Sequence, residues 1–340
     1  MAAMPDKMLC ELAHGFLREQ AEVLADHVEA VEGRQDIEPV HQVRVACRRM
    51  RAGLAFFGDC FDDDKAARWR TQLKKMLRRF GPARDCDVQI EWLQHTLDGM
   101  DENDKKTRPG IVRLLLRLRQ QRDALQPGLD KAVHRLQRER FTMNLHLETE
   151  RLLYEVQHAE EQAESIRFYD RAADRVGERL DEVFKKLPGL DDAADHAGHH
   201  ALRIAVKKLR YTLELSDRAL EGRLKKGIKR LKKFQTLLGN LHDCDVWEAQ
   251  IDAFIAEETE RTAAYYGHTR PMRRLLPGLR WLQTQRRQDR RCLFEAAAIF
   301  AAELEANDFW TWIAEAVKEN ADLSGNGEDR DDEEDTDGGQ

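Results

Sequence analysis

The segment HQVRVACRRMR at residues 41–51 returns as HALRIAVKKLR at residues 200–210, and this duplication decides the architecture. A second pair of segments follows in the same order, with GPARDCDV at residues 81–88 and GNLHDCDV at residues 239–246. Two motifs that repeat in order indicate an internal repeat. We therefore predict two homologous halves. The predicted units are residues 1–160, residues 161–321 and an acidic tail over residues 322–340.

The chain is expected to be helical almost throughout. Apolar residues recur at three- and four-residue intervals, and no alternating stretch is long enough for a strand. Short segments between long helices favour antiparallel neighbours in an all-α bundle. Prolines are expected to mark helix starts or ends: Pro39, Pro82, Pro109, Pro127, Pro188, Pro271 and Pro277. The predicted helices cover about residues 6–32, 38–58, 62–80, 83–99, 105–124, 128–160, 162–186, 195–216, 218–238, 241–267, 271–287 and 289–320.

The composition indicates in which cellular compartment the protein is expected. No window approaches the ~20 consecutive apolar residues that a membrane-spanning helix needs, and the first residues contain no apolar run typical of a signal peptide. The 6 cysteines form no CxxC pair, so we expect reduced, mostly buried thiols and no zinc site built on them. These features predict a soluble cytoplasmic protein with no membrane partner.

The charge is distributed unevenly along the chain. Lys and Arg total 56 and Asp and Glu total 63, a net charge of −7. Acidic residues of the tail account for this excess, so the rest of the chain is nearly neutral and local basic faces matter more than the total. A tail rich in Gly, Asp and Glu is expected to be disordered. It is interpreted as a solubilising segment, with competition for a basic site as the alternative.

Basic residues form rows beside the apolar stripe of each repeated helix. In residues 41–51, Val43, Cys47 and Met50 share one helical face, and the basic row borders it. Like charges four residues apart repel each other. A single such row is typical of a solvated face, but duplicated rows facing each other across a cleft would form a channel for an anion. The candidate binding residues are His41, Arg44, Arg48, Arg51, Lys74, Arg78, His200, Arg203, Lys207, Arg210, Lys229, Lys232 and Lys233. Weaker candidates are His14, Arg18, Arg171 and Arg175.

Two further patterns have both structural and functional interpretations. His196, His199 and His200 have a spacing that could hold a metal, but no cysteine or carboxylate completes the set at matching spacing, so a helix start or an anion contact is preferred. The two Asp-Cys-Asp motifs are interpreted as helix N-caps with ion pairs to a neighbouring basic helix, with cation bridging to phosphate as the alternative. No glycine-rich phosphate loop, GxSxG or HExxH motif occurs. We expect neither a catalytic residue nor a cofactor.

The segments at residues 41–51 and 200–210 resemble the two hallmark segments of the conserved-histidine α-helical domain, CHAD, and the resemblance extends over about residues 6–320. It implies two pseudo-symmetric four-helix bundles around a basic cavity that binds inorganic polyphosphate, and an association with polyphosphate granules. Members are often fused to a triphosphate-tunnel phosphatase domain, whose ExExK strand is absent here, so hydrolysis is not implied. His242 stands where the family usually has Arg, and Lys207 replaces the Arg48 of the first copy.

The sequence therefore predicts a non-catalytic binder of inorganic polyphosphate. The first rival is a binder of nucleic acid or another polyanion, which the nearly neutral body and the few aromatics among the basic rows disfavour. The second rival is an adaptor that binds a metal or carries a phosphohistidine, through His196, His199 and His200.

Overall fold

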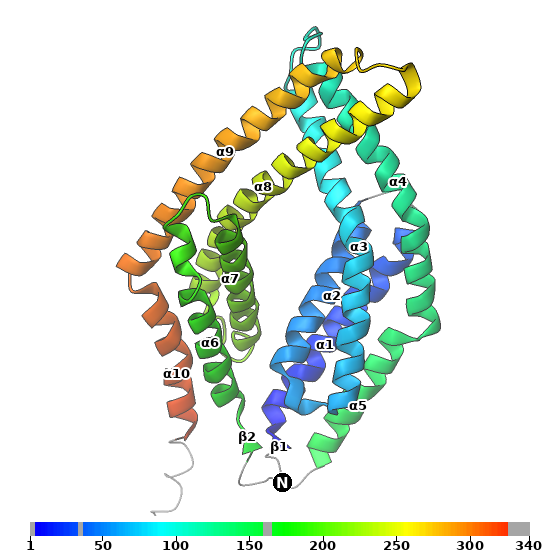
Figure 1. The fold of residues 1–340 in the computed structure, drawn as a ribbon. Helices are drawn as coiled ribbons and strands as arrows, with labels where there is room; N and C mark the ends of the chain where they lie inside the picture. Colours follow the sequence, from blue (N-terminus) through cyan, green and yellow to red (C-terminus); the bar gives the residue numbers. More distant parts are fainter. Residues whose placement is uncertain (1–3, 33–36, 159–164, 326–340) are drawn as a thin grey trace, which may run out of the picture.

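The computed structural model describes residues 4–32, 37–158 and 165–325 of the chain. The fold is all-α, as predicted, and the strands among these residues are only two residues long. No helix in this part of the chain is long and apolar enough to cross a membrane. The helices are α1 (Lys7–Val28), α2 (Glu38–Phe56), α3 (Asp63–Asp98), α4 (Arg108–Arg138), α5 (Phe141–His158), α6 (Phe168–Phe184), α7 (His196–Ser216), α8 (Lys225–Tyr266), α9 (Met272–Ala306) and α10 (Phe309–Gly325) (Figure 1).

The order and packing of the helices repeat between α1–α5 and α6–α10. In each group the first helix packs against the second and the fifth, the second against the third, and the third against the fourth. Each group follows a short strand, β1 (Met4–Pro5) or β2 (Ser165–Ile166), and the two strands pair in parallel. The Asp6 carboxylate accepts a hydrogen bond from Leu9 N–H in α1 at 2.6 Å and another from Phe168 N–H in α6 at 2.9 Å. These contacts tie the starts of the two halves together.

A residue with positive φ separates the fourth helix from the fifth in each half. Arg140 has φ 47° between α4 and α5, and Asp308 has φ 49° between α9 and α10. A left-handed residue cannot continue a right-handed helix, so the chain turns there. The continuous helices predicted over residues 128–160 and 289–320 are therefore wrong. Among its described residues each half has five helices, where the resemblance implies four.

Three prolines lie inside helices, contrary to the prediction that they mark helix ends. Pro82 lies within α3, Pro127 within α4 and Pro277 within α9. Pro82 and Pro127 are exposed, so the opposite face still packs on the core and offsets the backbone hydrogen bond that proline removes. The other predicted boundary prolines do lie at helix starts: Pro39, Pro109, Pro188 and Pro271.

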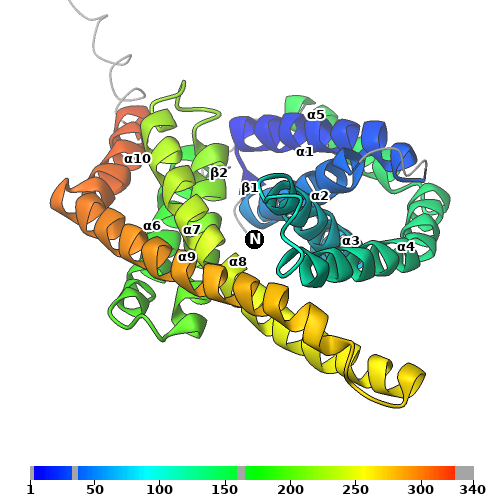
Figure 2. The same ribbon diagram turned by 90° about the horizontal axis from the view of Figure 1, so that it is seen from above.

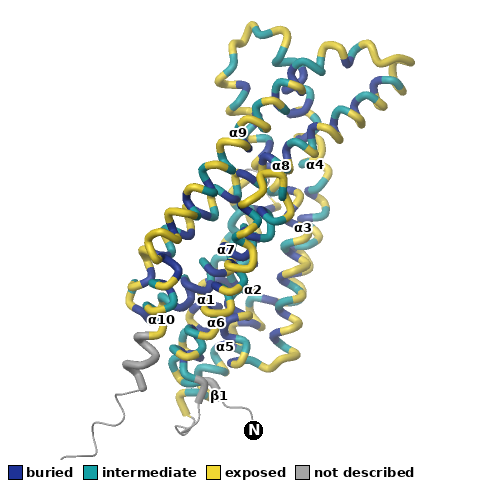
Figure 3. Tube along the Cα trace, turned by 60° about the vertical axis from the view of Figure 1, so that its left-hand side comes forward, coloured by how far each residue is buried: buried dark blue, intermediate teal, exposed yellow. Residues whose placement is uncertain are grey.

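Two apolar cores hold the molecule together, and both contain residues from both halves. The larger core includes Phe80 of α3 and Phe234 of α8, and the smaller includes Leu97 of α3 and Ile251 of α8. Buried residues lie mainly on the sides of helices that face other helices (Figure 3). All 6 cysteines are free, and Cys292 is the exposed one. The predicted division of the chain near residue 160 falls among residues that the structure does not describe.

The smaller core forms where the C-terminal part of α3 and the N-terminal part of α4 meet the C-terminal half of α8 and the N-terminal part of α9 (Figures 1 and 2). Two glycines permit the close approach of α4 and α9. A Cβ atom on Gly110 would collide with the carbonyl oxygen of Leu275, and one on Gly278 would collide with that of Thr107. This junction joins the halves at one end, and the β1–β2 pair joins them at the other (Figure 1).

The C-terminal helix extends further than expected. Helix α10 continues to Gly325, so residues 322–325, predicted to belong to a disordered tail, are helical. The remainder of the predicted tail, residues 326–340, lies outside the described residues.

Candidate functional site

The two copies of the repeated segment lie in α2 and α7, which contact each other across the two halves. The predicted apolar stripes are buried, with Val43, Cys47 and Met50 in α2 and Leu202 and Val206 in α7 all 0% exposed. The basic rows border these stripes and are half-buried. We call the following residues the central basic cluster: His41, Arg44 and Arg48 of α2, Arg84 of α3, His200, Arg203 and Lys207 of α7, and His242 of α8.

Cations from both halves act on one another within this cluster. Burial, together with the positive charges of Arg203, Arg48 and Arg44, lowers the pKa of Lys207 to about 8. Burial likewise lowers the pKa of Arg203. The negative charge of Asp243 opposes this effect, and the positive charge of Arg48 adds to it. Cations of α2 and α7 therefore lie close enough for their charges to influence one another's pKa.

Few protein groups compensate these charges. Arg44 Nη1 donates a hydrogen bond to the carbonyl oxygen of Leu77 at 3.3 Å. The Nε atoms of Arg48 and Arg203 are buried and have no hydrogen-bond partner in the described structure. Within the same residues, none of the ion pairs holds Arg44, Arg48 or Lys207. A buried Nε atom without a partner is costly, so these two atoms are available to donate hydrogen bonds to an anion.

One aspartate from each half lies beside the cluster. Burial raises the pKa of Asp85, and the nearby Arg44 and Arg84 oppose this rise. Burial also raises the pKa of Asp243. The positive charge of Arg203 opposes this rise, and the negative charge of Asp85 adds to it. The first aspartate of each Asp-Cys-Asp motif therefore partly neutralises the arginines, and the two carboxylates are near enough to influence each other.

The second aspartate of each motif ion-pairs with the next helix, as predicted. Asp87 Oδ1 accepts from Arg122 Nε of α4 at 2.7 Å, and Asp245 Oδ1 accepts from Arg290 Nε of α9 at 2.6 Å. The predicted N-cap role is wrong, because α3 and α8 run through these motifs without a break. Packing around the motif overrides the local tendency of Gly81 to end a helix.

Histidines give the second half a different chemistry from the first. His200 Nδ1 lies 3.3 Å from His242 Nδ1, and the ring centroids are 4.3 Å apart. Burial lowers the pKa of His242 to about 4, and Arg203 and His200 contribute. In the first half, burial lowers the pKa of His41 and Arg84 lowers it further.

The histidines proposed as metal ligands have separate partners. His196 Nδ1 lies 2.7 Å from Asp245 Oδ1, and His199 Nδ1 lies 3.5 Å from Arg290 Nη2. Residues 4–32, 37–158 and 165–325 contain no group of three His, Cys, Asp or Glu side chains arranged to hold a metal. The structure thus offers no support for the metal-binding alternative.

The remaining predicted binding residues lie outside the central basic cluster. Arg210 donates to Gln235 at 2.8 Å and pairs with Glu214, and Lys233 lies 4.3 Å above the ring of Phe300. The others on α2, α3 and α8 are exposed: Arg51, Lys74, Arg78, Lys229 and Lys232. The weaker candidates are in ion pairs, His14 with Glu150, Arg18 with Glu22, Arg171 with Asp59 and Arg175 with Glu178.

Three basic residues at or near the site were not among the predicted binding residues: Arg84, His242 and Arg286. Arg84 occupies the repeat position of His242, so the aligned motifs did carry a signal for it. Arg286 of α9 lies 4.2 Å above the ring of Trp92 and lowers the pKa of Asp243. No repeated motif contains Arg286, so only the approach of α9 to α8 places it there.

Comparisons with known proteins agree with this fold. A family model described as the CHAD domain matches residues 15–252. The crystal structure of the CHAD domain from the plant Ricinus communis is similar at 21% identity and a TM-score of 0.57, covering 91% of this chain and 93% of that chain. PptA from Streptomyces chartreusis is similar at 18% identity and a TM-score of 0.52, covering 85% of this chain and 98% of that chain. No curated protein matches the sequence.

Proposed function

Since this chain belongs to the CHAD domain family, we propose that it binds inorganic polyphosphate through the central basic cluster. The observation that carries the proposal is that cations of α2 and α7, only partly neutralised by Asp85 and Asp243, lie close together. Lys207 of one half is close enough to Arg48 and Arg44 of the other for their charges to lower its pKa. A linear polyanion between the two helices would remove this repulsion and supply oxygen acceptors to the buried Nε atoms.

The proposal favours polyphosphate over nucleic acid. Recognition of single-stranded nucleic acid relies on aromatic platforms for the bases, and neither repeated segment, residues 41–51 or residues 200–210, contains Phe, Trp or Tyr. Trp92, next to the cluster, already has Arg286 over its ring. Phosphate oxygens alone satisfy the guanidinium and ammonium groups, so a ligand without bases fits better.

The proposed role is binding without catalysis. The chain carries no recognisable hydrolase motif, and the cluster residues are assigned to charge neutralisation and hydrogen bonding only. In a cell, such a protein would concentrate on polyphosphate granules in the cytoplasm. A fluorescent fusion that stays diffuse in granule-containing cells would contradict this localisation.

Charge reversal of the cluster tests the proposal. The variant carries Arg44→Glu, Arg48→Glu, Arg203→Glu and Lys207→Glu. Calorimetry with long-chain polyphosphate should show at least a hundredfold loss of affinity, about 2.7 kcal/mol. A milder variant, Arg48→Gln with Lys207→Gln, should lose about tenfold and guards against misfolding, which circular dichroism would detect.

The matched control reverses four exposed cations outside the cluster. Its changes are Lys185→Glu, Lys186→Glu, Arg280→Glu and Arg291→Glu. The control alters the net charge equally, so it should lose only a small, salt-sensitive part of the affinity. Equal losses in the two variants would overturn the proposal, and so would duplex DNA that competes with polyphosphate phosphate for phosphate.

A further inference from the structure

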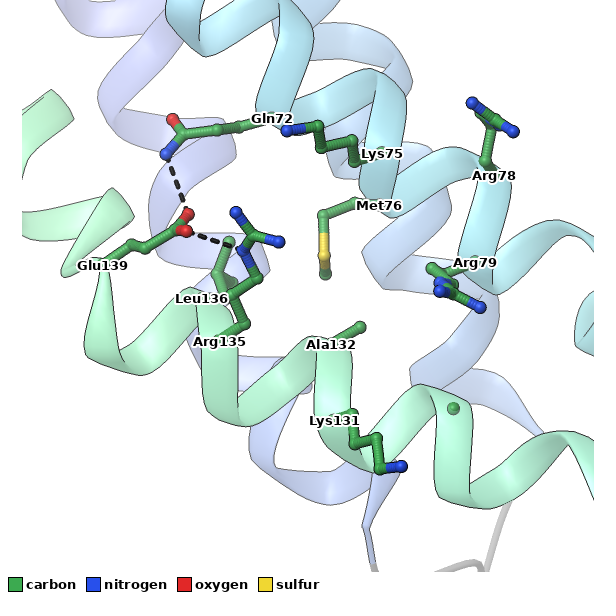
Figure 4. A pocket seen from close by; sticks show the side chains of 11 residues that line it. Gln72, Lys75, Met76, Arg78, Arg79, Lys131, Ala132, Arg135, Leu136 and Glu139 are labelled. Carbon is green, nitrogen blue, oxygen red and sulfur yellow. Dashed lines mark hydrogen bonds and ion pairs between the residues drawn. The ribbon is translucent and has the colours of Figure 1, made fainter.

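A second basic site lies between α3 and α4, outside the central basic cluster (Figure 4). This α3–α4 groove has a volume of about 630 Å³. Met76 of α3 and Ala132 and Leu136 of α4 line its apolar part, and cations from both helices border it. The bordering cations are Lys75, Arg78, Arg79, Lys131 and Arg135.

The charges of the groove are largely uncompensated. Glu139 is the one acidic side chain that lines it, and this carboxylate already accepts from Arg135 Nε at 2.6 Å and from Gln72 Nε2 at 2.9 Å (Figure 4). In the described part of the chain, Lys75, Arg79 and Lys131 take part in no ion pair within 4.0 Å. The groove therefore carries a net positive charge beside an apolar surface that weakens solvent screening.

In the second half, aromatic residues stand at two of the positions that line this groove in the first half. The Asp87–Arg122 and Asp245–Arg290 pairs align α4 with α9 and place Ala132 opposite Phe300 in the repeat. The same alignment matches Met76 with Phe234. The rings of Phe234 and Phe300 are 5.8 Å apart, and Lys233 lies over Phe300. In the first half, a flexible and a small side chain, Met76 and Ala132, stand in place of these two rings.

Helix α3 connects the groove to the central basic cluster. Arg78 borders the groove and shares a helical face with Lys74 and Asp85. Asp85 lies two turns further along α3, about 10 Å by the helical rise, and is next to Arg44 of the cluster. A linear anion that leaves the cluster would meet Arg78 before it reaches the groove.

We propose that the α3–α4 groove is a second binding subsite for polyphosphate. One stretch of a long polyphosphate chain lies in the central basic cluster while another stretch of the same chain lies in the groove. This inference rests on the proposed function and adds a preference for long chains. A short chain fills the cluster alone, and a long chain gains the second set of contacts at the high effective concentration that the first site provides.

The test compares tripolyphosphate with long-chain polyphosphate on the full chain. The groove variant carries Lys75→Gln, Arg79→Gln and Lys131→Gln, all at exposed positions. Its control, Lys185→Gln, Lys186→Gln and Arg291→Gln, removes the same charge from the second half. A second variant, Ala132→Phe, fills the groove with the side chain that the repeat carries at Phe300 and changes no charge.

The groove variant should bind the long chain about tenfold more weakly, with a log–log salt slope smaller by about two, and should bind tripolyphosphate as the unmodified protein does. Ala132→Phe should weaken long-chain binding about threefold. The inference is overturned if long-chain affinity falls no more than in the control, or if tripolyphosphate binding falls equally. If the unmodified protein binds neither chain, the proposed function itself fails.

Discussion

The first half places Arg84 and Arg48 where the second half places His242 and Lys207. The helix order is the same in both halves, yet the first half has two guanidinium groups where the second half has an imidazole and an ammonium group. His242 has its pKa lowered to about 4 and Lys207 has its pKa lowered to about 8. The repeat therefore preserves packing, while the chemistry of the two halves has diverged at the site and at the α3–α4 groove.

The largest expected effect is on stability, at the crossing of α4 and α9. There we test whether Gly110 of the first half and Gly278 of the second half are equally necessary. Gly110→Val and Gly278→Val should each lower the free energy of unfolding by about 3 kcal/mol, because each new side chain collides with a backbone carbonyl. Urea unfolding monitored by circular dichroism measures both. The control Gly128→Ala has nothing within 4 Å of its new Cβ and should stabilise the helix by about 0.5 kcal/mol. If Gly278→Val lowers the free energy of unfolding and Gly110→Val does not, the two glycines are not equivalent.

A somewhat smaller effect compares the two aspartate–arginine pairs. Asp87→Asn and Asp245→Asn each leave a guanidinium group without its anion. The side chain of Asp87 is 3% exposed and that of Asp245 is 13% exposed, so Asp87→Asn should cost about 3 kcal/mol and Asp245→Asn about 2 kcal/mol. Thermal unfolding of both variants gives the order. The reverse order would mean that burial does not govern the strength of these pairs.

The charge of Lys207 is expected to lower the stability of the protein and to strengthen polyphosphate binding, and one substitution tests both effects. Its folded pKa of about 8 lies below the ordinary lysine value of 10.5, so the unfolded chain binds more protons between those values and stability rises with pH across that window. Below pH 8 the full penalty for the charge remains. Lys207→Met should therefore raise the free energy of unfolding at pH 7 by about 1 kcal/mol and weaken polyphosphate binding.

Lys208→Met is the control for that change, because Lys208 is exposed and pairs with Glu182 at 3.0 Å. It should not stabilise the protein. Unfolding measured from pH 7 to pH 10 should lose part of its pH dependence in Lys207→Met only. An unchanged profile in that variant would contradict the interpretation of Lys207 as a repelled, buried cation.

The smallest effect concerns the histidine pair. His242→Arg gives the second half the residue that the first half carries at Arg84, and should strengthen polyphosphate binding about fivefold at pH 7.5, since one permanent charge is added. The gain should shrink as the pH falls toward 4, where His242 itself becomes protonated. Calorimetry at the two pH values measures the difference, and a gain independent of pH would contradict the titration of His242.

The sequence was most informative in the two repeated helical segments, residues 41–51 and 200–210. The duplicated segments correctly predicted that Val43 and Leu202 lie in the core and that Arg48 and Lys207 lie beside it. Patterns that depend on a single residue were less informative. Pro82 looked like a helix end, and α3 passes through it.

Periodicity and repetition by themselves determined the all-α class, the duplication and the basic rows of α2 and α7, because these depend on residues a few positions apart on one helix. Tertiary structure alone decided which rows meet and which charges lack partners. It brought Arg286 to Asp243, and it left a groove at Ala132, where the other half carries Phe300. Such contacts join helices that are distant in sequence, and their free energy depends on burial and packing volume that no local pattern records.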